Sequence, residues 1–130
     1  MKSVLIIDDD SDFVKLYERA FLNAAFSVDY SLTIPKAEKL IKKKKYDVIL
    51  LDILFPNADG LSTIHLIRSE KSPNSDTPIL IVTNLDAGEK TKKAFKYGAN
   101  QCLFKVNHTP KTVLETVNRL VGNNRSQKAN

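Results

Sequence analysis

Short apolar runs alternate along the chain with longer segments in which apolar residues recur every three or four positions. The runs have the length of buried or half-buried strands, and they cover residues 3–7, 26–32, 48–51, 79–82 and 102–104. The segments that follow them predict helices over about 11–23, 33–45, 60–68, 87–97 and 110–121. A strand and a helix therefore alternate five times.

Capping residues support these helix boundaries. Asp10 or Ser11 can cap the first helix, and Thr33 can cap the second, because their side-chain oxygens accept hydrogen bonds from free backbone N–H groups. Gly98 stands where a glycine commonly ends a helix, at the end of the fourth.

The alternation predicts an α/β fold with a doubly wound, five-stranded parallel sheet and five helices, because each parallel strand pair needs a crossover connection. We expect one domain over residues 1–121 and a polar, disordered tail over residues 122–130. The carboxyl ends of the strands would then share one edge of the sheet, where ligands bind in folds of this class.

The composition fits a globular protein that needs no disulfide or structural metal to stabilise its fold. Its 130 residues suffice for one domain, no apolar run approaches the ~20 residues that span a bilayer, and the start lacks a signal-peptide core. The lone Cys102 cannot form an internal disulfide. We therefore expect a cytoplasmic protein that does not insert into membranes.

The net charge of +5 is unevenly distributed. Residues 1–86 carry 11 Lys and Arg against 13 Asp and Glu, whereas residues 87–130 carry 9 against 2, so the two parts have net charges of −2 and +7. Solvated helix faces are the usual explanation for such a bias. Direct binding to nucleic acid is not expected from charge alone.

Polar residues stand directly after four of the predicted strands. Asp8 and Asp9 follow the first strand, Asp52 the third, Thr83 the fourth and Lys105 the fifth. Oxygen ligands without a neighbouring His or Cys favour Mg²⁺ or Mn²⁺. A carboxylate beside such a metal, a lysine and a hydroxyl suits phosphoryl transfer to the carboxylate. We predict a divalent-cation site around a nucleophilic Asp52.

Each of these residues has an ordinary interpretation when it is taken alone. Acids after a first strand can simply cap a helix, and Asp52 can be a turn residue. Thr83 can end a strand, and Lys105 can be a solvated surface cation. Their joint placement at the ends of separate strands favours a shared site.

This arrangement resembles the receiver domain of two-component response regulators, including the single-domain receivers of chemotaxis. The acidic pair, Asp52 with Pro56 and Gly60 after it, Thr83 and Lys105 stand in the family's order within residues 3–121. The resemblance implies a flavodoxin-like fold with strand order 2-1-3-4-5.

The resemblance also implies a reaction. A histidine kinase or a phosphotransfer protein would phosphorylate Asp52, with Thr83 and Lys105 assisting. Asp9, Asp52 and the carbonyl of Leu54 would hold Mg²⁺, and Asp8 would act through water.

A receiver of this kind is a switch rather than a conventional enzyme, because it catalyses only its own phosphorylation and dephosphorylation. With no output domain in the sequence, it would act by docking on a downstream protein or by passing the phosphoryl group along a relay.

Three positions depart from the family pattern and bear on switching and access. Asn84 stands after Thr83, where the family usually has a small residue, and it would narrow access to Asp52. Val106 replaces the proline after the lysine, so a cis peptide, which costs roughly 3 kcal/mol without proline, is not expected. Cys102 replaces the aromatic switch residue, for which Tyr97 or Phe104 could substitute.

Other departures bear on the lifetime of the phosphorylated form and on self-association. Leu54 stands two residues after Asp52, and Leu85 stands two residues after Thr83. In the family, side chains at these two positions influence the water that hydrolyses the acyl phosphate. Because both residues are bulky and apolar, slow self-dephosphorylation is expected. Asn100 and Gln101 replace acids that often pair in a dimer of receivers, so a monomer is expected, with only a weak dimer as the alternative.

Other function classes compete with this interpretation. A pseudo-receiver would keep the fold as an interaction module without being phosphorylated, as Asn84, Cys102 and Val106 suggest. A phosphatase with a nucleophilic Asp would need a second acid where Leu54 stands. A nucleotide-binding protein would need a glycine-rich loop after Ile7.

Overall fold

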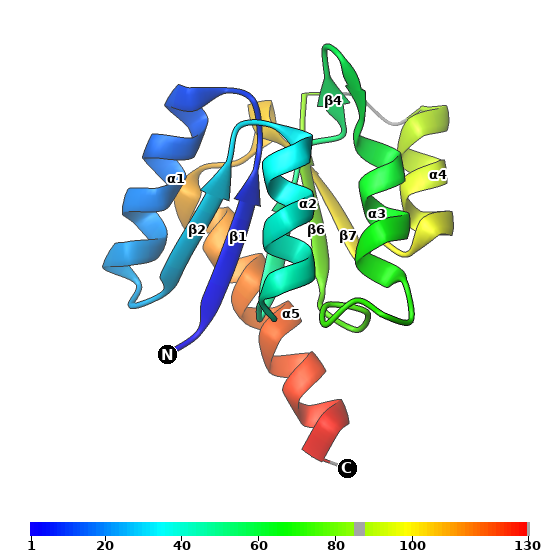
Figure 1. The fold of residues 1–130 in the computed structure, drawn as a ribbon. Coiled ribbons are helices and arrows are strands. Elements are labelled where there is room, and N and C mark those ends of the chain that lie inside the picture. Colours follow the sequence, from blue (N-terminus) through cyan, green and yellow to red (C-terminus); the bar gives the residue numbers. More distant parts are fainter. Residues whose placement is uncertain (85–87, 130) are drawn as a thin grey trace.

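A five-stranded parallel sheet forms the centre of the computed structural model, which describes residues 1–84 and 88–129, with side chains described to residue 123. The strand order is β2-β1-β3-β6-β7 (Figure 1). The strands are β1 (Ser3–Ile7), β2 (Ser27–Ser31), β3 (Val48–Leu51), β6 (Ile79–Thr83) and β7 (Gln101–Phe104). Because β4 and β5 lie outside this sheet, the order is the predicted 2-1-3-4-5.

Helices cover both faces of the sheet, as expected for a doubly wound fold (Figure 1). One face carries α1 (Ser11–Asn23) and α5 (Pro110–Ala129). The other carries α2 (Ile34–Lys43), α3 (Gly60–Arg68) and α4 (Glu89–Tyr97). The predicted α/β class and the five helices are confirmed.

Two apolar cores result, one on each face of the sheet. Successive residues of a strand point to opposite faces, so Leu5 of β1 packs with α2 and α3, whereas Val4 and Ile6 pack with α1 and α5. All four residues of β3 are buried. This explains why the strand signal was a continuous apolar run rather than an alternation.

The strand register brings the strand ends to one edge of the sheet. Ile7, the last residue of β1, pairs with Leu51, the last residue of β3. Thr83, the last residue of β6, pairs with Phe104, the last residue of β7. The residues that follow these strands therefore start from neighbouring positions.

Helix caps form at the predicted residues. Asp10 caps α1, and its side chain accepts hydrogen bonds from the backbone N–H groups of Asp12 and Phe13. The side chain of Thr33 accepts a hydrogen bond from the backbone N–H of Lys36 at the start of α2. Gly98 ends α4 with φ 121°, a conformation that side chains disfavour.

Arg68, the last residue of α3, connects the segment before β6 with the segment between α4 and β7. Its guanidinium donates to the carbonyl oxygen of Thr77 at 2.6 Å and, through Nη2, to that of Gly98 at 2.9 Å. Nη2 also donates to Oδ1 of Asn100, which in turn accepts from the backbone N–H of Ile79 at 2.8 Å. These bonds tie the C-terminal end of α4 to α3.

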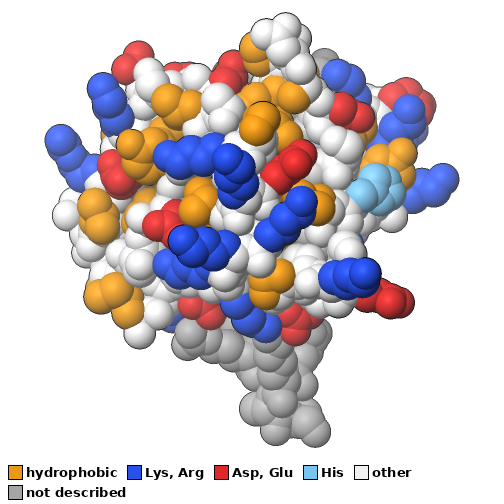
Figure 2. Space-filling model, in the orientation of Figure 1, with side chains coloured by type: hydrophobic (Ala, Val, Ile, Leu, Met, Phe, Trp, Pro, Cys, Tyr) orange, Lys and Arg blue, Asp and Glu red, His pale blue; other side chains and the backbone are white. Residues whose placement is uncertain are grey.

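The lysines of α2 lie on its solvent side. The exposed residues there include Lys36, Lys39, Lys42 and Lys43. Figure 2 shows the face covered by α2 and α3, with Lys and Arg side chains gathered over α2. A solvated helix face therefore accounts for this run of positive charge.

The structure differs from the sequence prediction in three places. β4 (Leu54–Phe55) and β5 (Ala58–Asp59) form a small antiparallel hairpin, where turn-forming residues predicted only a loop. A short 3₁₀ helix covers Lys105–Asn107. Helix α5 continues to Ala129 through most of the predicted disordered tail, in a stretch that contains no proline.

In the part of the chain described, no helix is both long and apolar enough to cross a bilayer.

Candidate functional site

The three acids after β1 point in different directions and have different surroundings. Asp8 is 1% exposed, and its Oδ1 accepts a hydrogen bond from the backbone N–H of Asp10 at 2.9 Å. Asp9 is exposed. Asp10 is the cap of α1, so the helix-capping interpretation holds for this acid. Asp8 and Asp9 are therefore the acids of this segment that are available for a site at the edge of the sheet.

Asp52 follows β3 and is 5% exposed. Its backbone N–H bonds to the carbonyl oxygen of Ile7 at 2.9 Å, which fixes it beside the end of β1. Its Oδ1 accepts a hydrogen bond from the backbone N–H of Leu54 at 2.9 Å. This bond orients the carboxylate and places the backbone of β4 next to it.

Thr83, the last residue of β6, and Lys105, the first residue after β7, reach the same carboxylate. The hydroxyl of Thr83 donates to Oδ1 of Asp52 at 2.9 Å, and Nζ of Lys105 donates to Oδ2 at 3.2 Å. Nζ also pairs with Oδ2 of Asp8 at 2.8 Å. Four residues that are far apart in the sequence thus meet at one point.

Burial sets the electrostatics of this cluster. It raises the pKa of Asp8 to about 6, against the opposing effect of the hydrogen bonds from Lys105 and Asp10, and the nearby charge of Asp52 adds to the rise. Burial alone would lower the pKa of Lys105, but the bonds and charges of Asp8 and Asp52 outweigh it, so that pKa is raised. The lysine is a cation held between two acids.

The same acids fit a hard divalent cation. Asp8, Asp9 and Asp52 each offer a carboxylate oxygen, and these oxygens lie within 4.8 Å of one another. Carboxylates of this spacing suit Mg²⁺ or Mn²⁺, which prefer oxygen ligands and keep several waters. The donor set therefore agrees with the expected metal.

The predicted access and switch positions lie around this cluster. Asn84 is exposed directly after β6, and Cys102 is half-buried on β7. Leu85 lies outside the described residues. Val106 is 82% exposed. No cis peptide bond is present among the described residues, as expected for a valine in place of the family's proline. Phe104 lies beside Thr83 in the β6–β7 pairing, whereas the ring of Tyr97 contacts His65 at 4.1 Å.

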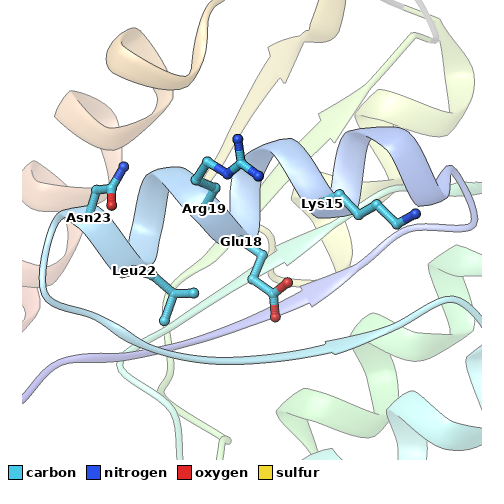
Figure 3. A pocket seen from close by; sticks show the side chains of 5 residues that line it. All are labelled: Lys15, Glu18, Arg19, Leu22 and Asn23. Atoms are coloured by element: carbon cyan, nitrogen blue, oxygen red, sulfur yellow. The ribbon is translucent and has the colours of Figure 1, made fainter.

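One surface hollow lies beside the acidic cluster, and another lies along α1. The first, of about 390 Å³, is lined by Asp9 and mainly by apolar residues around the start of α2 and in the β4–β5 hairpin. The other lies along α1 and is lined by Lys15, Glu18, Arg19, Leu22 and Asn23 (Figure 3). No residue of the acidic cluster lines the second hollow.

Sequence reasoning missed one neighbour of the cluster. Nζ of Lys105 lies 4.3 Å from the centroid of the Phe13 ring. In the sequence, Phe13 is one of the regularly spaced apolar residues of the helix predicted over 11–23, and this spacing carries no signal for a contact with a lysine 92 positions later.

Comparison with known families decides the identity of the domain. Residues 4–118 match the model of the response regulator receiver domain. The chain belongs to this family. As a receiver it is related to proteins that act in two-component signalling, and the predicted family, fold and strand order are confirmed.

Relatives of known sequence are longer than this chain. It is 28% identical over 105 residues to the response regulator ArlR of Staphylococcus haemolyticus, covering 81% of this chain and 46% of that protein. It is 29% identical over 127 residues to the swarming motility regulation protein RssB of Serratia marcescens, covering 96% and 57%. The chain spans about half the length of the curated relatives it matches.

Solved structures agree on the fold. A CheY-like receiver domain protein of Methanospirillum hungatei superposes with a TM-score of 0.89 at 18% identity, covering 98% of both chains. The chemotaxis protein CheY4 of Vibrio cholerae gives 0.84 at 27%, covering 92% of this chain and 98% of that one. A response regulator of Burkholderia pseudomallei, solved with a phosphorylated aspartic acid and a calcium ion, gives 0.81 at 25%, covering 99% and 74%.

Proposed function

We propose that this receiver is switched by phosphorylation of Asp52, with the phosphoryl group supplied by a histidine kinase or a phosphotransfer protein. The observation that carries the proposal is the convergence of Thr83, Lys105 and the Leu54 N–H on the Asp52 carboxylate. The phosphorylated aspartic acid of the Burkholderia relative supports it.

In the proposed reaction, a carboxylate oxygen of Asp52 attacks phosphorus. The new P–O bond forms as the P–N bond to the donor histidine breaks, and the electron pair of that bond returns to the imidazole nitrogen. The ammonium of Lys105 offsets negative charge on the moving oxygens, and the hydroxyl of Thr83 can donate to one of them. The Leu54 N–H holds the carboxylate in place.

Mg²⁺ or Mn²⁺ would be held by Asp9, Asp52 and the backbone carbonyl of Leu54, with Asp8 acting through water. Bound there, the ion would neutralise charge on the phosphoryl oxygens. The carboxylate spacing and the calcium ion in the Burkholderia relative support this assignment.

The output of the switch would be a binding event. Phosphorylation would change the surroundings of Thr83 and, through them, the surface offered to a downstream protein. We propose a cytoplasmic protein that does not insert into membranes and does not act through direct nucleic-acid binding, and a monomer rather than a stable dimer.

Intact mass tests the proposal. After incubation with acetyl phosphate and Mg²⁺, the parent chain is expected to gain the mass of one phosphate, and Asp52→Asn is expected to gain none. Equal behaviour of the two chains, both without added mass, would support the pseudo-receiver alternative that Asn84, Cys102 and Val106 suggest.

A further inference from the structure

The ammonium of Lys105 has an aromatic ring as its third close neighbour. Its Nζ lies 2.8 Å from Asp8 Oδ2, 3.2 Å from Asp52 Oδ2 and 4.3 Å from the centroid of Phe13. The lysine side chain is only 12% exposed. At this distance a ring face attracts a cation, and the attraction is stronger where water is excluded.

Phe13 is fixed from two directions. Its backbone N–H donates to the capping side chain of Asp10 at 3.2 Å, which sets its place in the first turn of α1. Its ring stacks on Tyr17 with centroids 4.1 Å apart and planes 24° apart, and Tyr17 is 3% exposed. The ring is therefore a rigid surface beside the acidic cluster.

A ring face and a carboxylate hold a cation in different ways. A carboxylate oxygen accepts a directed hydrogen bond, whereas the ring attracts the whole ammonium without fixing the direction of its N–H groups. An ammonium over a ring can thus turn its N–H groups from one acceptor to another without leaving its position.

We propose that Phe13 is a positioning residue for Lys105: its ring holds the ammonium within reach of Asp52 and lets it turn from the carboxylate to the oxygens of the arriving phosphoryl group. The inference rests on the proposed phosphorylation of Asp52. Phe13 would touch neither the phosphoryl group nor the metal.

Fluorinated phenylalanines at position 13 give a direct test, because fluorine weakens the ring's attraction for a cation and changes its size little. We expect the rate of phosphorylation by acetyl phosphate and Mg²⁺ to fall stepwise along the mono-, di- and pentafluoro series, to roughly three- to tenfold below the parent. Phe13→Leu should show a similar loss, and Phe13→Tyr should restore most of the rate. Leu16→Ala, at a 54% exposed position of the same helix, is the control and should match the parent.

Proton NMR supplies a second readout, which reports the contact between the Phe13 ring and Lys105 independently of the phosphorylation rate. The ring current of Phe13 should shift the ε-methylene protons of Lys105 upfield, and Phe13→Leu should abolish that shift in a chain that remains folded. The same phosphorylation rate across the fluorinated series, or an unchanged chemical shift of the Lys105 ε-methylene protons in Phe13→Leu, would overturn the positioning role alone. A parent chain that takes up no phosphate would overturn the proposed phosphorylation and the positioning role with it.

Discussion

At the scale of single residues, the three acids after β1 differ in how deeply they are buried. Asp8, Asp9 and Asp10 are consecutive and chemically identical, yet one is buried beside Lys105, one is exposed and one caps α1. The sequence predicted an acidic cluster but could not assign these depths, since they follow from the direction in which the chain turns after β1.

Asp8→Asn is expected to stabilise the fold near neutral pH. The folded chain holds the Asp8 proton more tightly than an unfolded chain, with a pKa of about 6 against 3.8, so ionisation of Asp8 costs stability that grows as the pH rises through this window. Denaturation at pH 7 should show a gain on the order of 2 kcal/mol for the variant, shrinking towards zero near pH 4.

Asp9→Asn removes the same charge from an exposed position and serves as the matched control. At pH 7 it should change the free energy of unfolding by less than Asp8→Asn does. A gain for Asp8→Asn that stays constant from pH 4 to pH 7 would contradict the assigned cause.

Leu54 is expected to slow the loss of the phosphoryl group. It is a half-buried apolar residue whose backbone bonds to Asp52, so its side chain offers no hydrogen bond to an attacking water. Leu54→Asn should speed dephosphorylation several-fold in a phosphate-release assay. A parent form that decays within seconds would contradict the expectation.

At the scale of elements, the start of α3 is pressed against the chain that follows β3. A Cβ on Gly60 would lie 2.6 Å from the Cα of Ile53, the residue after Asp52. Gly60→Ala should therefore lower the free energy of unfolding by about 1–3 kcal/mol, as overpacking does, and slow phosphorylation by displacing Ile53.

The matched control is Gly122→Ala in α5, where an added Cβ meets no atom within 4 Å. Because alanine favours a helix over glycine, this variant should gain roughly 0.5–1 kcal/mol. Chemical denaturation of both variants measures the contrast, and equal effects would rule out the close approach at Gly60 as the cause.

The main elements were predictable because their signals are local. Apolar runs such as 48–51 and helical spacing such as that of Val113 and Val117 follow directly from which faces are buried. The β4–β5 hairpin was not predictable, because two strands of two residues each show no periodicity. The contact of Phe13 with Lys105 joins opposite ends of the chain and depends on the assembled fold.

At the scale of the whole molecule, a divalent cation should act as a stabiliser. Mg²⁺ that binds the folded acidic cluster and not the unfolded chain adds about 2.7 kcal/mol at a concentration of one hundred times its Kd. Thermal unfolding should show a rise in Tm with added Mg²⁺ in the parent and a much smaller rise in Asp9→Asn. The rise should shrink below about pH 6, where protonation of Asp8 competes with the cation.

The hydrogen bonds of Arg68 restrict which end of α4 can move. Its C-terminal end is held through the Gly98 carbonyl, whereas at its N-terminal end Gly88 offers no side-chain cap. We expect a helix held in this way to pivot about its anchored end. A signal that begins beside Thr83 would then produce its largest displacement at the first turn of α4 and almost none at Gly98.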